Sequence, residues 1–339
     1  MKVAIVILNW NGQKLLEKFM PSIIEHSKEA TIYLADNAST DDSIDYVKTH
    51  FPSIKIIENT VNGGYAKGYN DALKHLNEDI FCLLNSDVEV TKNWLVPIIE
   101  TFKKEPNTAI IQPKLLNYNR RDYFEYAGAA GGFIDKFGYP YCRGRIFNTI
   151  EKDTGQYNDT FDIFWASGAC LFIRKNIFIQ LGGFDESFFA HMEEIDLCWR
   201  AKNVGFDIKY VGKSQIYHVG GATLSNTDPK KTFLNFRNSL FALTKNAKGN
   251  LFVLIITRLI LDGIAGIKFL YELKLKHIAA IIRAHGSFYK HLGKLLKQRK
   301  SFTNKRKYYT QTSIIIKYYI YNFKYFKSLQ KFTKVLLKC

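Results

Sequence analysis

The alternation of short apolar runs with helical patterns in the first 104 residues predicts an α/β fold. About four apolar runs, each followed by a helical pattern, are typical of an open, mostly parallel sheet with helices on both faces. The first run, residues 3–8, is apolar throughout, as expected of a strand that is covered on both sides. A change to strongly basic composition near residue 251 predicts that a basic helical C-terminal extension follows the sheet.

The expected elements are placed by their periodicity and by the turn residues between them. The first part of the chain alternates strands at 3–8, 31–35, 54–57 and 80–84 with helices over 13–26, 42–49, 65–76 and 92–104. The segment 117–165 is rich in Tyr, Phe, Gly and Asn, which predicts hairpins and loops over the sheet edge. Regular structure resumes with strands at 169–173, 206–211 and 215–218 and helices over 175–181, 192–204 and 229–246.

Charge is distributed unevenly along the chain of 339 residues, whose formal net charge is +17. Residues 251–339 contain 19 Lys and Arg but only two acids, whereas basic and acidic residues balance in residues 1–250. A neutral body with a basic C-terminal region indicates an anionic partner, which is either a membrane surface or nucleic acid.

The pattern within the basic region favours a membrane surface. The apolar run from Leu251 is interrupted by charges before it reaches the ~20 apolar residues of a membrane span. Arg258 and Asp262 are four residues apart and can pair on one helix face, as can Lys268 and Glu272. Near the end of the chain a basic stripe lies opposite an aromatic one, which predicts a helix in the membrane interface. Its members are Lys317, Lys324, Lys327, Lys331, Lys334, Lys338, Tyr319, Phe323, Phe326 and Leu329.

The N-terminal apolar run is too short for a secretory signal, and the five cysteines form no CxxC pair. Buried, reduced cysteines fit a reducing compartment. We therefore expect a cytoplasmic protein that lies peripherally on the inner face of the cell membrane.

Carboxylates and amides follow several of the expected strands. Asn85, Ser86 and Asp87 stand where the strand at 80–84 leaves the sheet, and ligands collect at the carboxyl ends of strands in such sheets. Mg²⁺ and Mn²⁺ prefer oxygen ligands and are often held by one or two carboxylates and substrate phosphates. Asp36, after the second strand, can accept hydrogen bonds from a base or ribose, although the run that follows it also caps a helix. The glycine-rich run at 62–70 resembles a phosphate loop only loosely.

A second acidic cluster begins the expected helix at 192–204. Glu193, Glu194 and Asp196 place three negative charges within four residues, which tends to raise carboxylate pKa values toward the range useful for a base. The cluster lacks the HExxH spacing of zinc proteases, so a zinc site is not expected. His218, at the end of the strand at 215–218, is either a metal ligand or a structural histidine.

The order of the motifs resembles that of the family 2 glycosyltransferases, in particular the bacterial rhamnosyltransferase-like branch. The runs are VAIVILNWNG, ADNASTDDS, NGGYAKGYN, LLNSDVEV, SGACLFIRK, GGFDESFFAHMEEIDLCWR and YHVGG, and the resemblance covers about residues 1–245. It implies a GT-A fold, an inverting mechanism and a nucleotide-diphosphate sugar as donor. The chain would then comprise a catalytic domain over 1–250 and a membrane-associating region over 251–339.

The resemblance also implies roles for individual residues. Asn9 and Trp10 match the N-terminal nucleotide-binding segment, and Asp36 contacts the nucleoside. The run Asn85 to Asp87 stands in the place of the DxD motif, with Asp87 as the metal-binding member and Asn85 near the donor. His218 matches a position that supplies a metal ligand in some members. Residues assigned to the nucleotide sugar are therefore Asn9, Trp10, Asp36, Asn62, Gly64, Asn85 and Asp87, and those assigned to the metal are Asp87 and His218.

Glu193 and Glu194 match the family's Glu-Asp pair, whose second member is the catalytic base. Here the second member is Glu194, and its longer side chain leaves Glu193 as the alternative. A single base suits this chemistry because a nucleoside diphosphate leaves as an anion that Mn²⁺ or Mg²⁺ can stabilise, so no general acid is required. We expect transfer of a hexosyl or deoxyhexosyl group to a hydroxyl of a glycan or lipid-linked acceptor in cell-surface polysaccharide synthesis.

Two other classes of protein compete with this interpretation. A nucleic-acid-binding protein would explain the basic tail, but no recognisable nucleic-acid module accompanies it, so we expect no nucleic-acid partner. A nucleotidyltransferase that makes sugar nucleotides also uses a metal and an α/β sheet. It would be expected to carry a glycine-rich, basic triphosphate loop near its N-terminus, where this chain has LNWNGQK.

Overall fold

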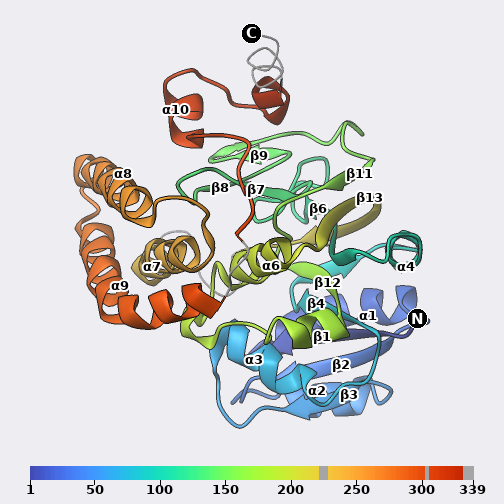
Figure 1. The fold of residues 1–339 in the computed structure, drawn as a ribbon. Coiled ribbons are helices and arrows are strands. Elements are labelled where there is room, and N and C mark those ends of the chain that lie inside the picture. Colours follow the sequence, from blue (N-terminus) through green and yellow to red (C-terminus); the bar gives the residue numbers. More distant parts are fainter. Residues whose placement is uncertain (221–227, 302–304, 331–339) are drawn as a thin grey trace.

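A central mixed sheet organises the molecule, and the computed structural model describes residues 1–220, 228–301 and 305–330 (Figure 1). In the described residues the strands run in the order β11-β13-β6-β12-β4-β1-β2-β3, and β5 pairs with β13. The strands are β1 (Val3–Asn9), β2 (Thr31–Asp36), β3 (Lys55–Glu58), β4 (Ile80–Asn85), β5 (Val88–Val90), β6 (Thr108–Asn117), β11 (Thr160–Asp162), β12 (Cys170–Arg174) and β13 (Asp207–His218).

The predicted parallel part of the sheet is confirmed, and its strands end at one edge. β1 is parallel to both β2 and β4, and β2 is parallel to β3. β12 runs antiparallel to β4 and β6, so the sheet is mixed beyond β4. The helices of this part are α1 (Gln13–His26), α2 (Ser43–His50), α3 (Gly64–Leu73), α4 (Leu95–Lys104), α5 (Lys175–Gln180) and α6 (Glu193–Val204).

Helices cover both faces of the sheet because successive residues of β1 point to opposite sides. Ala4 and Val6 belong to an apolar cluster that also holds residues of α3 and α6. Ile5 and Ile7 belong to a separate cluster with residues of α1 and α4. These side chains of β1 are at most 2% exposed, which explains the unbroken apolar run in the sequence.

The long buried strand β6 is absent from the sequence-based expectations. Pro113 and Lys114 lie within it, and proline cannot donate to a neighbouring strand, so this segment does not read as a central strand. The structure accommodates it where β13 bulges: Val211 pairs with Pro113, and the next pair joins Gln215 to Lys114. Beyond β6, the predicted hairpins form a small antiparallel sheet of β7 (Gly132–Ile134), β8 (Pro140–Cys142), β9 (Arg145–Ile146) and β10 (Thr149–Ile150).

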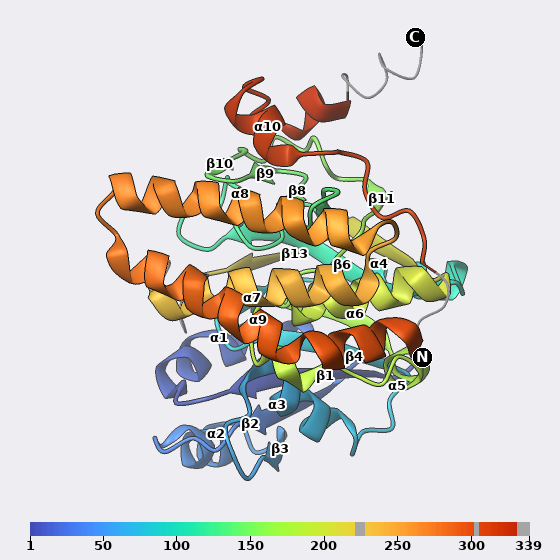
Figure 2. The ribbon, with the colours of Figure 1, turned by 60° about the vertical axis from the view of Figure 1, so that its left-hand side comes forward.

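Long helices form a further layer beside the sheet, as Figure 2 shows. They are α7 (Pro229–Asn246), α8 (Leu251–Tyr271) and α9 (Leu275–Ser301), followed by the short α10 (Ile314–Tyr319). Phe288 and Leu295 of α9 belong to the same apolar cluster as the sheet and α7. The predicted pair on α8 is present and buried, with Arg258 Nε 2.7 Å from Asp262 Oδ1. None of the helices in the described ranges is long and apolar enough to cross a membrane.

The end of the chain differs from the continuous helix that the lysine spacing suggests. α10 ends at Tyr319, and the next helical residues begin at Phe326. Phe326 and Leu329 do not face outward: they are buried against Tyr141 and Ile146 of the small sheet. Lys331, Lys334 and Lys338 lie outside the described residues. Phe326 and Leu329 therefore contribute to an internal cluster, whereas Tyr319 stays exposed.

Candidate active site

The carboxyl ends of the parallel strands bring the predicted polar residues together. In the pairing register Asn9 lies opposite Asp36, and Leu8 lies opposite Asn85. β13 reaches the same edge, because its last residue, His218, pairs with Val88 just after the turn that follows β4. The topology thus brings side chains from β1, β2, β4 and β13 to the same end of the sheet, although these strands lie far apart in the sequence.

Asp87 and His218 form a buried pair at this edge. His218 Nε2 lies 3.1 Å from Asp87 Oδ1, and both side chains are under 10% exposed. The backbone N–H of Gly220 also donates to Asp87, at 3.3 Å. Burial opposes the charge on Asp87, but the His218 contact outweighs it and lowers the pKa of the carboxyl.

A second carboxylate, Glu125, approaches the other side of the His218 ring. Glu125 Oε1 lies 3.4 Å from His218 Nδ1, and the Glu125 side chain is 4% exposed. Burial would lower the pKa of His218, but Glu125 and Asp87 together raise it to about 10. Glu125 was missed by the sequence analysis, because it lies in the irregular segment 117–165, where no periodicity or spacing distinguishes it.

Asn9 and Asp36 form a hydrogen-bonded unit between β1 and β2. Asn9 Nδ2 donates to Asp36 Oδ1 at 2.9 Å, and Ser39 donates to both Asp36 oxygens through its backbone N–H and its hydroxyl. Both predicted residues are almost completely enclosed, while Trp10, the next residue, is 50% exposed. Asn9 Oδ1 is buried with no hydrogen-bond partner among the described residues.

The loop before α3 joins this unit to the second acidic cluster. Asn62 Oδ1 accepts hydrogen bonds from the Gly64 backbone N–H and from Asn37 Nδ2. Gly64 has a φ of 75°, and a Cβ there would stand 2.5 Å from the carbonyl oxygen of Phe189. A side chain at position 64 would therefore displace the loop that leads into α6.

Glu193 and Glu194 begin α6 after a strained loop. Phe189, His191 and Met192 all have left-handed φ values, of 65°, 68° and 73°, which cost free energy for residues other than glycine. Such strain is typical of functional sites.

Both glutamates carry a polar atom that the surrounding structure does not satisfy. The Oε2 atoms of Glu193 and Glu194 are buried and accept no hydrogen bond within the described part of the chain. Burial raises the pKa of Glu194 to about 7, and burial with the neighbouring Glu194 charge raises that of Glu193 well above its usual range. Glu193 is 4% exposed, whereas Glu194 is partly exposed. Glu194 is therefore the member of the pair that is both accessible and poised to exchange a proton near neutral pH.

Tyr65 and the turn before β12 connect the two acidic clusters. Burial raises the pKa of the Tyr65 hydroxyl, and the charges of Glu193 and Glu194 raise it further, so both carboxylates lie near this ring. The Tyr65 hydroxyl donates to the carbonyl oxygen of Gly168 at 2.8 Å. One residue further, the carbonyl of Ala169 accepts from the backbone N–H of Asn85.

Buried ion pairs hold α6 in place. Arg200 Nε lies 2.8 Å from Asp196 Oδ2, one helical turn away. Lys245 of α7 lies between two carboxylates, 2.7 Å from Asp185 and 2.9 Å from Asp196. The third acid of the EEID run is thus a structural group, and the two before it are left free of ion-pair partners in the described ranges.

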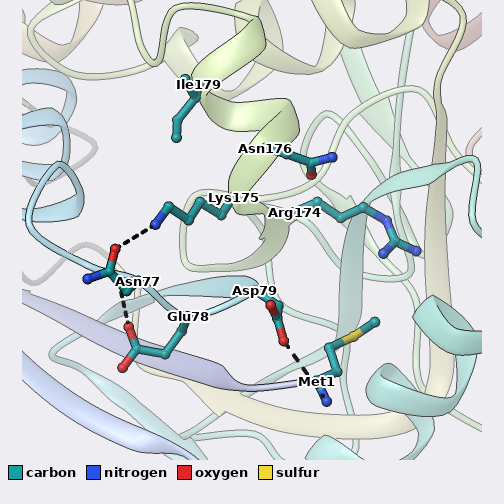
Figure 3. A pocket seen from close by; sticks show the side chains of 8 residues that line it. All are labelled: Met1, Asn77, Glu78, Asp79, Arg174, Lys175, Asn176 and Ile179. Carbon is teal, nitrogen blue, oxygen red and sulfur yellow. Dashed lines mark hydrogen bonds and ion pairs between the residues drawn. The ribbon is translucent and has the colours of Figure 1, made fainter.

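The hollow drawn in Figure 3 lies at the opposite edge of the sheet. It is lined by Met1, Asn77, Glu78, Asp79, Arg174, Lys175, Asn176 and Ile179. Its polar groups satisfy one another: Lys175 Nζ donates to Asn77 at 2.9 Å, and the Met1 amino group lies 4.0 Å from Asp79. The predicted site residues do not line it.

The donor set at the strand edge fits a divalent cation shared with a ligand. No group of three or more His, Cys, Asp or Glu is arranged to hold a metal in the residues that the structure describes. The Asp87 carboxylate is a suitable ligand, and the His218 imidazole becomes a second one when a bound cation displaces its proton. Mg²⁺ or Mn²⁺ commonly takes its remaining ligands from substrate phosphates and water.

Comparison with known proteins identifies related sequences. The model of the family described as glycosyl transferase family 2 matches residues 4–182. The N-acetylglucosaminyl-diphospho-decaprenol L-rhamnosyltransferase of Mycobacterium tuberculosis strain H37Rv is 24% identical over 233 residues, covering 63% of this chain and 75% of the relative. The rhamnosyltransferase WbbL of Escherichia coli K12 is 22% identical over 225 residues, covering 64% and 83%.

Solved structures show the same fold at low sequence identity. GalNAc-T7, solved with UDP, GalNAc and Mn²⁺, aligns with a TM-score of 0.62 at 16% identity, covering 95% of this chain and 57% of that one. The mannosyltransferase PcManGT of Pyrobaculum calidifontis, solved with GDP-Man and Mn²⁺, aligns with a TM-score of 0.53 at 14% identity, covering 85% and 87%. The chain has a GT-A fold. It belongs to glycosyl transferase family 2, in the rhamnosyltransferase-like branch, and is a glycosyltransferase that depends on a nucleotide-sugar donor.

Proposed function

We propose that the protein transfers a hexosyl or deoxyhexosyl group from a nucleoside-diphosphate sugar to a hydroxyl of a glycan or lipid-linked acceptor in cell-surface polysaccharide synthesis, with inversion at the anomeric carbon. The observation that carries the proposal is the pair Glu193 and Glu194. Their buried oxygens lack partners in the described structure, and the pKa of Glu194 is raised to about 7. Two rhamnosyltransferases among the relatives support the choice of sugar class.

Glu194 acts as the base in this proposal. Its carboxylate takes the proton from the acceptor hydroxyl while that oxygen forms a bond to the anomeric carbon. The bond between the anomeric carbon and the donor phosphate breaks, and its electron pair leaves with the nucleoside diphosphate. A positioned base of this kind contributes roughly 10²–10⁴ in rate. Glu193, more deeply enclosed, remains protonated and keeps the local charge low.

Asp87 and His218 would hold a divalent cation, Mn²⁺ or Mg²⁺. When bound, that ion supplies positive charge to the leaving diphosphate and so replaces a general acid. The proposal is supported by the donor set, a carboxylate beside an imidazole, and by the Mn²⁺ present with nucleotides or nucleotide sugars in two solved relatives. Asn85, whose Nδ2 lies 3.5 Å from His218 Nε2, borders the same place.

The nucleotide would be bound by the unit around Asn9 and Asp36. Asn9 has a free buried acceptor, Oδ1, and Trp10 exposes an aromatic face on which a base can stack. Asp36 keeps Asn9 and Ser39 in place through three hydrogen bonds. Asn62 and Gly64 would complete the donor side by keeping the loop before α6 close to α3.

The basic region 251–339 is proposed to hold the enzyme peripherally on the cytoplasmic face of the cell membrane. Its 19 basic and two acidic residues favour an anionic lipid surface. An acceptor built on a lipid would then be confined to the same surface as the enzyme.

A product assay tests the transfer reaction. Purified protein with Mn²⁺, a panel of nucleotide sugars and a glycan or lipid-linked acceptor should release a nucleoside diphosphate in step with glycosylated product. Release of inorganic pyrophosphate from a nucleoside triphosphate and a sugar phosphate would instead identify a nucleotidyltransferase. The variant Glu194→Gln should bind the donor but fail to transfer.

A further inference from the structure

The outer face of α8 exposes a row of large apolar side chains. Residues of this row recur every three or four positions, so they share one side of the helix. They are Phe252, Ile256, Ile260, Ile264, Ile267 and Leu270, exposed by 43% to 73%. Leu254, Arg258 and Asp262 occupy the opposite, buried side. A helix at the surface of a soluble domain normally shows polar residues on its outer side, so this row needs a partner.

The apolar row continues onto two neighbouring segments. Tyr271 at the end of α8 and Leu273 in the turn after it are more than 80% exposed, and Tyr319 at the end of α10 and Ile320 just after it are more than 50% exposed. Lys268 Nζ lies 5.8 Å from the centre of the Tyr319 ring, so the end of α8 adjoins α10. We call the combined surface the α8–α10 face: the six residues of the row with Tyr271, Leu273, Tyr319 and Ile320. Figure 2 shows α8 on the outside of the helical layer with α10 above it.

The charges around the α8–α10 face are positive. Lys268, Lys274 and Lys276 border it, and the acid among them, Glu272, already pairs with Lys274 at 2.6 Å. Lys324 lies over the Tyr318 ring, 3.7 Å from its centre. Apolar side chains bordered by lysines and tyrosines match the chemistry of the lipid headgroup region, where hydrocarbon, dipoles and anionic charge meet.

We propose that the α8–α10 face lies in the headgroup region of an anionic bilayer. This inference names the surface through which residues 251–339 would hold the enzyme on the membrane, and it rests on that part of the proposed function. A second copy of the chain is a poorer partner for the face, because the region that carries it also carries the whole net charge of +17 and would repel its copy.

A vesicle-binding experiment on the full-length protein tests the assignment. The double variant Ile264→Glu/Ile267→Glu introduces two charges on the face at positions that are 56% and 55% exposed. The matched control, Val96→Glu/Ile179→Glu, makes the same charge change at positions 46% and 63% exposed on α4 and α5. Cosedimentation is measured with phosphatidylcholine vesicles, with and without phosphatidylglycerol.

Wild-type protein and the control should sediment with the anionic vesicles. The partition coefficient of the face variant onto these vesicles should be lower by about tenfold or more. The emission of a Tyr271→Trp variant should shift to shorter wavelength when anionic vesicles are added. Equal binding by all three proteins, or no binding by the wild type, would overturn the assignment. A wild-type dimer that the face variant dissociates would overturn it in favour of a second copy. Transfer to a water-soluble acceptor should be the same in all three, so that a failure of docking is distinguished from a failure of the transferase reaction.

Discussion

The amino ends and the carboxyl ends of the parallel strands form two edges of the central sheet. These two edges differ in how completely their polar groups are hydrogen-bonded. At the amino edge, Lys175 donates to Asn77, and Arg174 donates to the carbonyl oxygens of Thr108 and Phe102. At the carboxyl ends of the strands, Asn9 Oδ1, Glu193 Oε2 and Glu194 Oε2 accept no hydrogen bond within the described residues, and the loop before α6 is strained. The hollow at the amino ends of the strands has polar groups that bond to one another, whereas the proposed site has buried oxygens that a substrate could satisfy.

The largest expected effect tests the unsatisfied carboxylates. Glu194→Gln should lower turnover by roughly 10²–10⁴ because the amide cannot accept the acceptor proton. Donor affinity, measured by calorimetry, should stay unchanged, and the unfolding temperature should not fall, since a neutral side chain suits this buried position better than a charged one. Glu186→Gln makes the same change at an exposed position of the preceding loop and should leave turnover intact. A severe loss in Glu193→Gln with full turnover in Glu194→Gln would transfer the role of base to Glu193.

The next effect concerns the cation. Asp87→Asn should lower turnover by about 100-fold and weaken the donor-dependent binding of Mn²⁺, because a neutral amide attracts the ion less than a carboxylate does. Calorimetric titration of Mn²⁺ in the presence of the nucleoside diphosphate measures the change in Mn²⁺ binding. The control is Glu89→Gln, two residues along the chain, whose carboxylate pairs with Arg121 at 2.8 Å instead of with the site. If Asp87→Asn binds Mn²⁺ as the wild type does, the ion does not lie at this edge.

A smaller effect is expected from Glu125, which contacts His218 rather than the substrate. Glu125→Gln should lower Mn²⁺ affinity by about 10- to 100-fold, as for other carboxylates that orient a metal-binding histidine. Without donor, the unfolding temperature of Glu125→Gln should fall less than that of Glu125→Leu, because the leucine removes the polar contact altogether. An unchanged Mn²⁺ affinity would show that His218 is oriented without Glu125.

The pH dependence should give the smallest change. Burial raises the pKa of Glu194 to about 7, and the base must be deprotonated to act, so turnover should rise with pH through about 7. Between pH 8 and pH 6 turnover should fall by about tenfold, the change expected of a single group with this pKa. Pre-steady-state rates with saturating donor measure it. At the other edge, Lys175→Ala should leave both the rate and its pH profile as in the wild type, and a shift in either would break the contrast between the edges.

The parallel part of the fold could be predicted, because its strands are enclosed on both faces and their apolar runs are unbroken. The expected helix at 192–204 and strand at 169–173 agree with α6 and β12 to within a residue or so. β6 could not be predicted from local pattern, since Pro113 and Lys114 are tolerated only where β13 bulges opposite them. In the described residues, the helix expected from Lys317 is interrupted between Tyr319 and Phe326, and tertiary packing buries Phe326 and Leu329 against the small sheet.

The sequence could single out the strand-end residues of the proposed site, but it could not predict the contacts between them. Asp87 and His218 are 131 positions apart, and their contact depends on the antiparallel pairing of β5 with β13. Glu125 has no sequence signal, because its contact with His218 is created by the fold of an irregular segment. The metal-binding and base assignments stay predictions until the variants above are measured.

The contacts of α9 with the catalytic part of the chain matter for anyone who shortens the protein. The composition changes near residue 251, which invites removal of everything after that point to obtain a freely soluble enzyme. Asp185, however, bonds both to Lys245 and to Gln298 of α9, and Phe288 and Leu295 complete the apolar cluster around α7. Deleting α9 would uncover that cluster and loosen the anchor of α6, which carries the glutamates. A better-behaved sample is therefore to be sought by exchanging outward-facing residues of α8, with the chain kept at full length.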